Sequence, residues 1–240
     1  MKRIIFAIVF IFIANANLAQ YLMSIEKNDN SLVEISTSDI SQMTFYSECP
    51  GTPTVSYSGK TYNTVYIGTQ CWLKENLDVG SITQGSSNQN NNSVIEKYCY
   101  DNLESNCTTY GGLYQWNEAM QYGTTAGAQG ICPSGWHIPT KGEFETLKAA
   151  VNNDGNALKA VGQGTGAGAG ENTNGFSLLL GGYRAYDGLF KDLGVYTNLW
   201  SSTENGLNYA YYMDLYYSNS SIYLYDFYKW SGHSVRCLKD

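Results

Sequence analysis

The chain has 240 residues and a formal net charge of −7, and 14% of its residues are aromatic, including 21 tyrosines. Nucleic acid is not an expected partner, because phosphates are held by clustered lysine and arginine, which this acidic chain lacks. The length suffices for one domain of about 190 residues with a large core, plus a smaller N-terminal piece.

Residues 1–19 are typical of a secretory signal peptide. Lys2 and Arg3 precede an apolar run over residues 4–13, which is too short to span a bilayer stably, and Ala19 offers a small residue before a cut at Gln20. No cysteine lies at the cut, so a lipid anchor is not expected, and an uncleaved membrane tether is the alternative. Cleavage would leave a secreted or cell-surface chain with no membrane span and a charge of 12 − 21 = −9.

Residues 20–47 are expected to form a short β-strand segment ahead of a main domain over residues 48–240. Two apolar stretches, at residues 21–25 and 32–35, predict strands that a turn at residues 28–30 joins. Two strands alone are barely stable. We therefore expect this segment to lean on the main domain or on another copy of itself.

The main domain shows strand and helix patterns in alternation. Glycine, serine, glutamine and asparagine dominate residues 80–93, which predicts a mobile surface loop. Helical spacing of apolar residues predicts a helix over residues 112–122, and a capping box of Thr140 and Glu143 starts a second helix. Strands are expected at residues 59–68, 71–73, 176–180, 209–217, 222–228 and 234–238. Two helices among antiparallel strands and long loops predict an α+β fold.

Six cysteines in an exported chain favour disulfides over metal ligands. No short Cys/His spacing suits zinc, so no metal is expected. A bridge from Cys132 to Cys237 would close a loop of roughly 100 residues, worth up to about 4.7 kcal/mol in the chain-entropy model. Six cysteines allow 15 pairings, among which we expect Cys49–Cys71, Cys99–Cys107 and Cys132–Cys237.

The aromatic hairpin over residues 209–228 carries the most distinctive predicted surface. Alternation assigns residues 209, 211, 213, 215 and 217 to the core, and Ala210, Tyr212, Asp214 and Tyr216 to solvent. Tyrosine rings in solvent can stack on sugars or meet a protein, although tyrosine also simply favours strands. The candidate ligand-binding residues are Trp200, Glu204, Tyr212 and Tyr216, with Glu204 placed in a loop after Trp200.

No catalytic set is indicated by the sequence. His137 is expected to be packed or hydrogen-bonded, and His233 reads as a loop residue before the last strand. No nucleophile elbow or zinc-binding helix accompanies them. The glycine-rich residues 162–170 lack the following helix that a dinucleotide loop needs, so a flexible loop is expected. We therefore expect no catalytic residue and no cofactor.

Seven strings in order resemble one family, from about residue 49 to the end. They occupy residues 69–77, 98–102, 110–116, 132–139, 181–184, 199–204 and 234–237. The family that they resemble is the Fibrobacter succinogenes major paralogous domain, found in exported proteins largely of Fibrobacter and Bacteroidetes and without an established biochemical role. The resemblance implies a C-type lectin-like fold related to the formylglycine-generating, sulfatase-modifying enzymes.

The resemblance implies little about activity. Those enzymes use a copper-binding cysteine pair between motifs that Gly181-Gly182 and Val235-Arg236-Cys237 match, and no cysteine lies between Cys132 and Cys237 here. The calcium-binding strings of sugar-binding lectins are also absent. The sequence favours a non-catalytic module for a glycan or surface protein over a structural assembly protein, with a sulfatase-modifying type of enzyme third.

Overall fold

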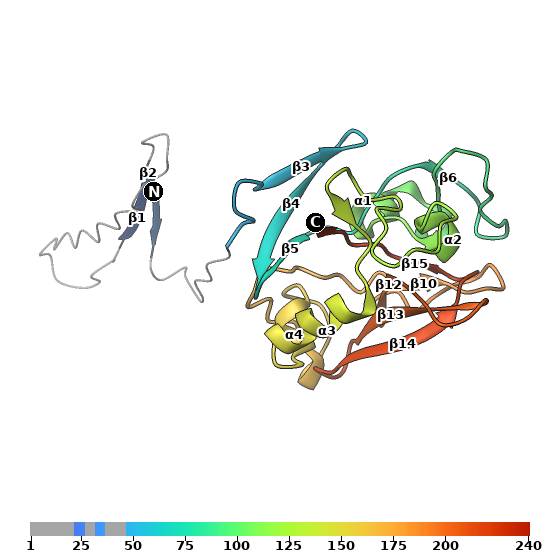
Figure 1. Ribbon diagram of the computed structural model, residues 1–240. Helices are drawn as coiled ribbons and strands as arrows, with labels where there is room; N and C mark the ends of the chain where they lie inside the picture. Colours follow the sequence, from blue (N-terminus) through green and yellow to red (C-terminus); the bar gives the residue numbers. More distant parts are fainter. Residues whose placement is uncertain (1–21, 27–31, 37–46) are drawn as a thin grey trace, which may run out of the picture. The chain divides into compact units, whose positions relative to one another are not determined.

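The computed structural model describes residues 22–26, 32–36 and 47–240, and the chain divides into two compact units, Met1–Phe45 and Tyr46–Asp240 (Figure 1). In the first unit, strand β1 (Leu22–Glu26) pairs antiparallel with β2 (Leu32–Ser36). Both strands lie where the apolar stretches predict them. The expected signal peptide and the turn at residues 28–30 lie outside the described residues.

The second unit is a mixed domain of many short strands and a few short helices. Its antiparallel strands and segregated helices make it an α+β domain, as expected from the sequence. Its helical segments are η2 (Tyr100–Asn102), α1 (Glu104–Tyr110), α2 (Trp116–Ala119), α3 (Lys141–Ala150), α4 (Gly155–Leu158) and η3 (Gly166–Gly168). Its strands are β3 (Thr54–Tyr57), β4 (Lys60–Ile67), β5 (Gln70–Leu73), β6 (Ser81–Ile82), β7 (Glu96–Lys97), β8 (Tyr114–Gln115), β9 (Trp136–His137), β10 (Tyr183–Arg184), β11 (Phe190–Lys191), β12 (Tyr196–Glu204), β13 (Tyr209–Tyr216), β14 (Ile222–Tyr228), β15 (Gly232–His233) and β16 (Leu238–Lys239).

One sheet joins the beginning and the end of this domain. Its strand order is β3-β4-β5-β16-β9, so the terminal strand β16 lies between β5 and β9. Alternating positions of β4 and β5 bury Val65, Ile67 and Trp72 against α3 residues such as Phe144, whose ring stacks on Trp72 at a centroid distance of 5.7 Å. Leu238 of the terminal strand is thereby part of the core of the domain.

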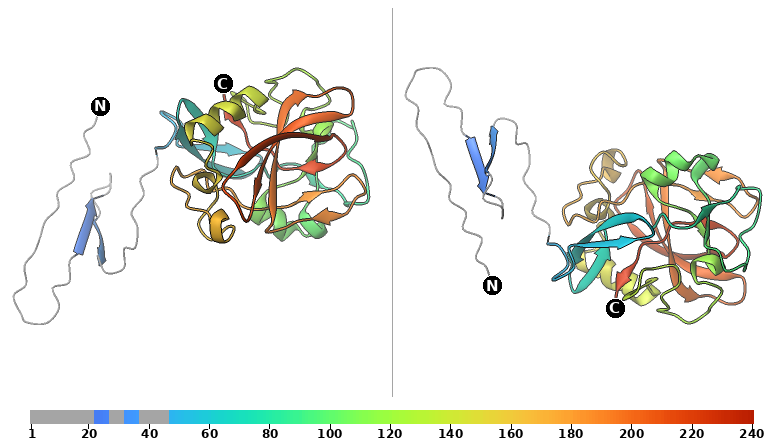
Figure 2. Two further views of the ribbon diagram at one scale, coloured as in Figure 1. Left: turned by 90° about the horizontal axis from the view of Figure 1, so that it is seen from below. Right: turned by 90° about the horizontal axis from the view of Figure 1, so that it is seen from above.

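A second sheet, β12-β13-β14, lies between two hydrophobic clusters, and its long, curved strands are clear in Figure 2. Trp200 and Tyr212 point into one cluster, while Leu199 and Met213 point into the other. Most of β12 is consequently buried on both faces, although its sequence is rich in serine, threonine and asparagine. That composition hid the strand, which the sequence did not predict.

The helices agree with the sequence in part. The capping box starts α3 as predicted, because Thr140 Oγ1 accepts from Glu143 N and the Glu143 carboxylate accepts from Thr140 N. The helix expected over residues 112–122 is only the four residues of α2, because β8 takes up the residues before it. Helix α1 is missed by periodicity, since Cys107 is its one buried residue.

Three further predictions are wrong in detail. Phe176, Leu178 and Leu180 are buried, but this segment makes one isolated bridge, Lys159 with Leu178, and no strand. The expected terminal strand over 234–238 is split into β15 and β16. The glycine-rich tract packs against the end of β13, where a side chain at Gly168 would collide with the Tyr217 carbonyl. Gly164 and Gly168 therefore allow close backbone packing at this point.

All three expected disulfides are present, and none of the six cysteines is free. Their Cα atoms lie 5.5 Å apart in Cys49–Cys71, 5.0 Å in Cys99–Cys107 and 5.9 Å in Cys132–Cys237. Three disulfides indicate an oxidising, extracellular environment. Within the described ranges, no helix has the length and apolar character needed to cross a membrane.

Candidate functional site

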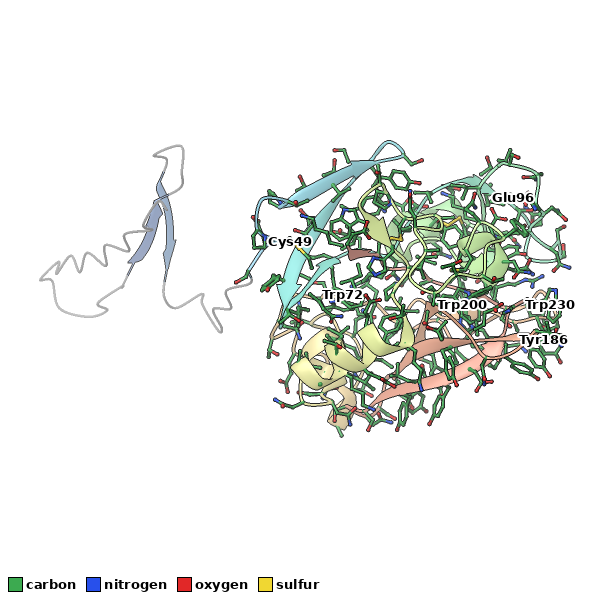
Figure 3. All side chains as sticks on the ribbon, viewed as in Figure 1. Cys49, Trp72, Glu96, Tyr186, Trp200 and Trp230 are labelled. Carbon is green, nitrogen blue, oxygen red and sulfur yellow. A yellow bond between two sulfur atoms is a disulfide. The ribbon has the colours of Figure 1, made fainter. Side chains whose placement is uncertain are left out.

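Trp200 is a core residue, which corrects its assignment as a ligand contact. Its side chain is 0% exposed, and its Nε1 donates to the Tyr114 carbonyl at 2.8 Å. Its ring stacks on the buried ring of His233 with centroids 4.0 Å apart. Figure 3 shows Trp200 inside the domain. A tryptophan so enclosed stabilises the fold and cannot reach a ligand.

Tyr212 is also largely buried. The prediction that it lies on a solvent-facing side of β13 is therefore wrong. It packs edge-on against Trp200 and Phe227, with ring centroids 6.3 Å and 6.0 Å away. Ala210 and Asp214 on the same face are buried too, and so are Met213 and Leu215 on the other. Alternation cannot identify the solvent face here, because the middle of the strand is covered on both sides.

Glu204 is the last residue of β12, and not part of a loop as expected. Its carboxylate pairs with the ammonium group of Lys229, which is 6% exposed and lies 4.3 Å from the centroid of the Trp116 ring. This ion pair ties the end of β12 to the residue after β14. The partner already present gives Glu204 a structural role in place of an open ligand contact.

Tyr216 lies at the surface among other tyrosines, as the sequence predicts for this residue. Its ring is 4.6 Å from that of Tyr196 on β12, and Tyr223 and Tyr225 stack on each other on β14 with centroids 5.4 Å apart. Cross-strand register places all four on one face of the sheet around Asp214. We call Tyr196, Tyr216, Tyr223 and Tyr225 the tyrosine face.

The two histidines are structural residues. His137 is hydrogen-bonded, as expected, through Nδ1 to Asp240 at 2.7 Å and through Nε2 to Glu143 at 3.1 Å, and these carboxylates raise its pKa. His233 is fully buried in β15, contrary to the loop expected, and burial lowers its pKa to about 3. A neutral, buried imidazole whose two nitrogens make no hydrogen bond to a hydroxyl or thiol does not form a nucleophile pair.

A second aromatic surface, absent from the predicted site residues, lies at the end of β14. Tyr186, Tyr228 and Trp230 line an open pocket of about 370 Å³ with Asn88. Their side chains are 64%, 39% and 45% exposed, and the rings of Tyr186 and Tyr228 lie 5.6 Å apart. Figure 3 shows Tyr186 and Trp230 at the same edge of the domain. We call Asn88, Tyr186, Tyr228 and Trp230 the aromatic platform.

The buried side chain of Arg184 fixes the backbone that carries the platform. The guanidinium group, 2% exposed, donates from Nε and Nη2 to the Gly85 carbonyl at 2.9 Å and 2.7 Å, and from Nη1 to the Trp230 carbonyl at 2.8 Å. Its planar carbon lies 4.8 Å from the centroid of the Tyr98 ring. One arginine therefore fixes the loop that carries Asn88 and the backbone of Trp230 together.

Two buried glutamines complete this support. Gln115 Nε2 donates to Asn88 Oδ1 and to the Trp230 carbonyl, both at 2.9 Å. Gln89 is 6% exposed and exchanges hydrogen bonds with the backbone and side chain of Gln115. The tract over residues 80–93, expected to be a mobile loop, is thus anchored by polar side chains in place of apolar ones.

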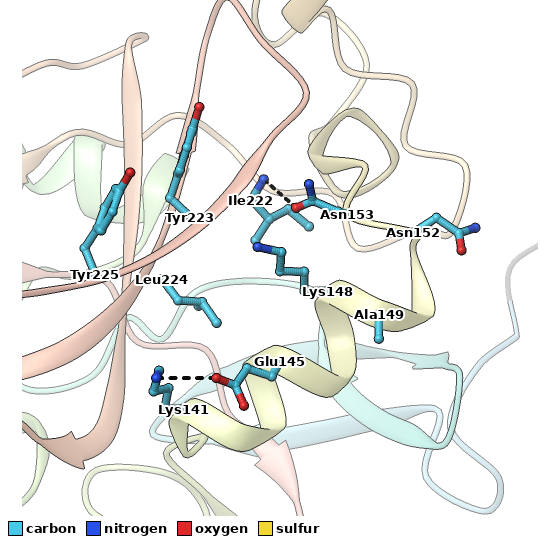
Figure 4. A pocket seen from close by; sticks show the side chains of 10 residues that line it. All are labelled: Lys141, Glu145, Lys148, Ala149, Asn152, Asn153, Ile222, Tyr223, Leu224 and Tyr225. Atoms are coloured by element: carbon cyan, nitrogen blue, oxygen red, sulfur yellow. Dashed lines mark hydrogen bonds and ion pairs between the residues drawn. The ribbon is translucent and has the colours of Figure 1, made fainter.

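Two other pockets include charged side chains that form an ion pair or a hydrogen bond within the protein. One, of about 660 Å³ between α3 and β14, is bordered by Tyr223, Tyr225 and Lys141, whose ammonium group pairs with Glu145 at 3.4 Å (Figure 4). A third, of about 430 Å³, is closed by the buried Arg236, which donates to Asn76 Oδ1. In the described part of the chain, no cluster of three metal-ligating side chains occurs. Of these three pockets, the platform is the one lined by three exposed aromatic rings and no charged side chain.

Sequence reasoning missed the platform because its residues come from three distant segments. One signal was available: Trp230 follows the aromatic strand directly and precedes Ser231-Gly232, so it had no place in either strand pattern. A tryptophan beyond the end of a strand is a candidate for the surface. The position of Tyr186, between β10 and β11, carried no such signal.

Comparison with known proteins identifies the family. No curated protein and no solved structure matches this chain. The model of the Fibrobacter succinogenes major domain matches residues 65–239, which is most of the chain and contains β12–β14, the tyrosine face and the aromatic platform. The chain therefore belongs to the Fibrobacter succinogenes major domain family.

Proposed function

We propose that this chain is an exported, non-catalytic binding module that holds a neutral glycan on the aromatic platform. One observation carries the proposal: three exposed aromatic rings line one pocket without a charged side chain. Large aromatic rings rarely gather in solvent unless they bind something. Flat rings with an amide beside them suit the apolar face and the hydroxyls of a pyranose.

The rigidity of the platform supports this function. Arg184 and Gln115 hold the Trp230 carbonyl, and Gln115 also orients Asn88, before any ligand arrives. A preformed site avoids the entropic cost of ordering loops on binding. Buried polar groups that meet at one surface loop stabilise the fold less than an apolar core would, which suggests that they serve the position of the rings.

The disulfides support the absence of catalysis of the sulfatase-modifying type. All six cysteines are bridged, so no thiol pair remains to bind copper. The shape of the fold supports a C-type lectin-like classification, which we also propose: the first and last strands of the domain share a sheet, a disulfide from Cys132 to Cys237 closes it, and long loops follow. In such a fold a ligand site on loops over a rigid sheet is common.

Binding to arrayed neutral oligosaccharides tests the proposal. We expect the wild-type domain to bind, and the Tyr186→Ala/Trp230→Ala double variant to bind about thirtyfold more weakly, from roughly 1 kcal/mol for each ring. Tyr225→Ala is the matched control, since it removes an exposed tyrosine outside the platform. Equal binding by the double variant and the wild type would refute the platform, and a wild type that binds only proteins would refute the glycan.

A second candidate is a structural assembly protein, and the N-terminal unit favours it. The register of β1 and β2 pairs Met23 with Ile35 and Ile25 with Val33 in a two-stranded sheet. Such a sheet needs a further layer for stability. Light scattering on the chain with and without residues 20–46 tests assembly: a larger mass that needs this segment would support it, and an identical monomer would exclude it.

A further inference from the structure

A buried carboxyl lies at the centre of the tyrosine face. Asp214 is 6% exposed, whereas the four tyrosines around it are half-buried or, for Tyr225, 52% exposed. Cross-strand register places Asp214 between Asn198 on β12 and Tyr223 on β14. The carboxyl group of Asp214 is therefore more deeply buried than the tyrosine rings around it.

The orientation of the β14 rings is visible in Figure 4. Tyr223 and Tyr225 extend to the side of the strand opposite Leu224, which points toward α3. Ile222 and Leu224 lie on the side of β14 that packs in the same cluster as α3, as alternation along a strand requires. The two stacked rings therefore border the face that carries Asp214, and both also line the pocket between β14 and α3.

Asp214 has one partner of its own and no counter-charge. With the Asn198 amide turned so that its nitrogen faces Asp214, Nδ2 donates to Asp214 Oδ1 at 3.1 Å and to the Thr197 carbonyl at 3.2 Å. Within residues 47–240, no ion pair reaches this carboxylate, and burial is the one cause that shifts its pKa. Buried carboxylates are usually paired with a cation, so this position is unusual.

We propose that Asp214 and the tyrosine face bind a methylated ammonium group of an extracellular ligand. The ammonium group of the ligand supplies the counter-charge that Asp214 lacks, and electron-rich ring faces attract a cation that lies within about 6 Å of their centroids. A quaternary ammonium group has no N–H to satisfy, which matches a site with one free carboxylate oxygen and few other acceptors. A neutral sugar would gain nothing from the charge of Asp214, so this site differs in chemistry from the platform.

Among the titratable groups described next, Asp214 is the one whose charge changes near neutral pH. Burial raises the pKa of Asp214 to about 7, and it raises the pKa of Tyr183, Tyr196 and Tyr212 above their usual value. His233 beyond Tyr212 stays neutral, with a pKa lowered to about 3. Tyr183 hydrogen-bonds the Asp192 side chain on the near loop. Cation binding should therefore strengthen as the pH rises from 6 to 8.

Calorimetric titration with choline and with 3,3-dimethylbutan-1-ol, its uncharged analogue of the same shape, tests the site in the full mature chain. We expect choline to bind at least tenfold more tightly than the alcohol at pH 8. Asp214→Asn should abolish that preference, and Tyr225→Leu should weaken choline severalfold. Tyr186→Leu on the platform should leave choline binding unchanged, so failure of the glycan proposal would not affect this result.

Equal affinity for choline and the alcohol, or full choline binding by Asp214→Asn, would overturn the proposal. Circular dichroism of each variant checks that the fold is kept, and Tyr225→Leu changes an exposed side chain that the core does not need. Soluble phosphocholine and phosphatidylcholine vesicles then separate two sources of the same group: binding to vesicles as well as to phosphocholine identifies a lipid headgroup, and binding to phosphocholine alone identifies a soluble or glycan-borne group. Either result supports ammonium recognition.

Discussion

The aromatic platform and the tyrosine face both present aromatic rings and both include residues of β14, yet they differ in what lies beneath the rings. Under the platform, the Arg184 guanidinium and two glutamines satisfy backbone carbonyls, so the pocket itself is uncharged. Under the tyrosine face lies a carboxyl without a cation. The comparison teaches that ring content alone does not define a site, because the buried polar group sets the ligand chemistry.

Asp214→Asn should produce the largest change, in the pH dependence of stability. The folded pKa of about 7 exceeds the ordinary 3.8, so the folded state keeps its proton more tightly than the unfolded state. Stability from this group is fully present below pH 3.8 and is lost as the pH rises to 7, by up to about 4 kcal/mol at 1.36 kcal/mol per pKa unit.

Urea unfolding of wild type and Asp214→Asn at pH 4, 5, 6 and 7 measures this difference. The wild type should lose stability relative to the variant across that range. His233 acts in the opposite direction, since its lowered pKa removes stability as the pH falls below 6.5. For that reason the comparison is between the two proteins at each pH. Parallel pH curves would show that Asp214 ionises normally.

Arg184→Met should break the platform with the next largest effect. The substitution leaves the buried carbonyls of Gly85 and Trp230 short of donors, at a cost of about 3 kcal/mol. Denaturant unfolding measures this loss of stability. In the folded Arg184→Met protein, glycan binding should disappear while choline binding persists. Arg184→Lys should have a free energy of unfolding between those of the wild type and Arg184→Met. An ammonium group cannot donate to both carbonyls with the bidentate geometry of a guanidinium group. An unchanged unfolding midpoint for Arg184→Met would contradict this account of the support.

Trp230→Ala separates binding from stability. Its side chain is 45% exposed, so removing it should change the free energy of unfolding by no more than about 1 kcal/mol. Glycan binding should weaken about fivefold, from about 1 kcal/mol for one ring, which titration calorimetry with the best arrayed oligosaccharide can measure. Trp200→Phe is the informative contrast: it alters a buried ring, so it should lower stability more than it lowers affinity. The reverse pattern would place the ligand in the core.

Asn88→Ala should have the smallest effect. It removes the amide that Gln115 orients beside the rings but leaves the rings in place. We expect a two- to threefold loss of glycan affinity, consistent with one hydrogen bond of about 0.5 kcal/mol, and no change in choline affinity. Surface plasmon resonance on immobilised glycan resolves a change of this size. A loss as large as that of Trp230→Ala would mean that the amide, and not the rings, dominates binding.

The sequence predicted the features that local chemistry controls. The capping box of Thr140 and Glu143, the aromatic hairpin and the three disulfides follow from short patterns and from an even set of cysteines. Strand β12 did not follow, because tertiary burial on both faces overrides its polar composition. Trp200 shows the same limit for the site: its type suggested a ligand contact, and only the three-dimensional packing against His233 reveals a core residue.

The tryptophans permit the most direct test of the platform. Four of the five are nearly inaccessible, and Trp230 alone among them is 45% exposed; the buried four are Trp72, Trp116, Trp136 and Trp200. Fluorine NMR of the protein labelled with 5-fluorotryptophan should give one resonance that responds to the solvent, and Trp230→Phe assigns it. Titration with cellohexaose, xylohexaose and mannohexaose should shift that resonance and leave the other four in place. A shift at a buried tryptophan with none at Trp230, or no shift with any of the three sugars, would contradict the platform as a glycan site.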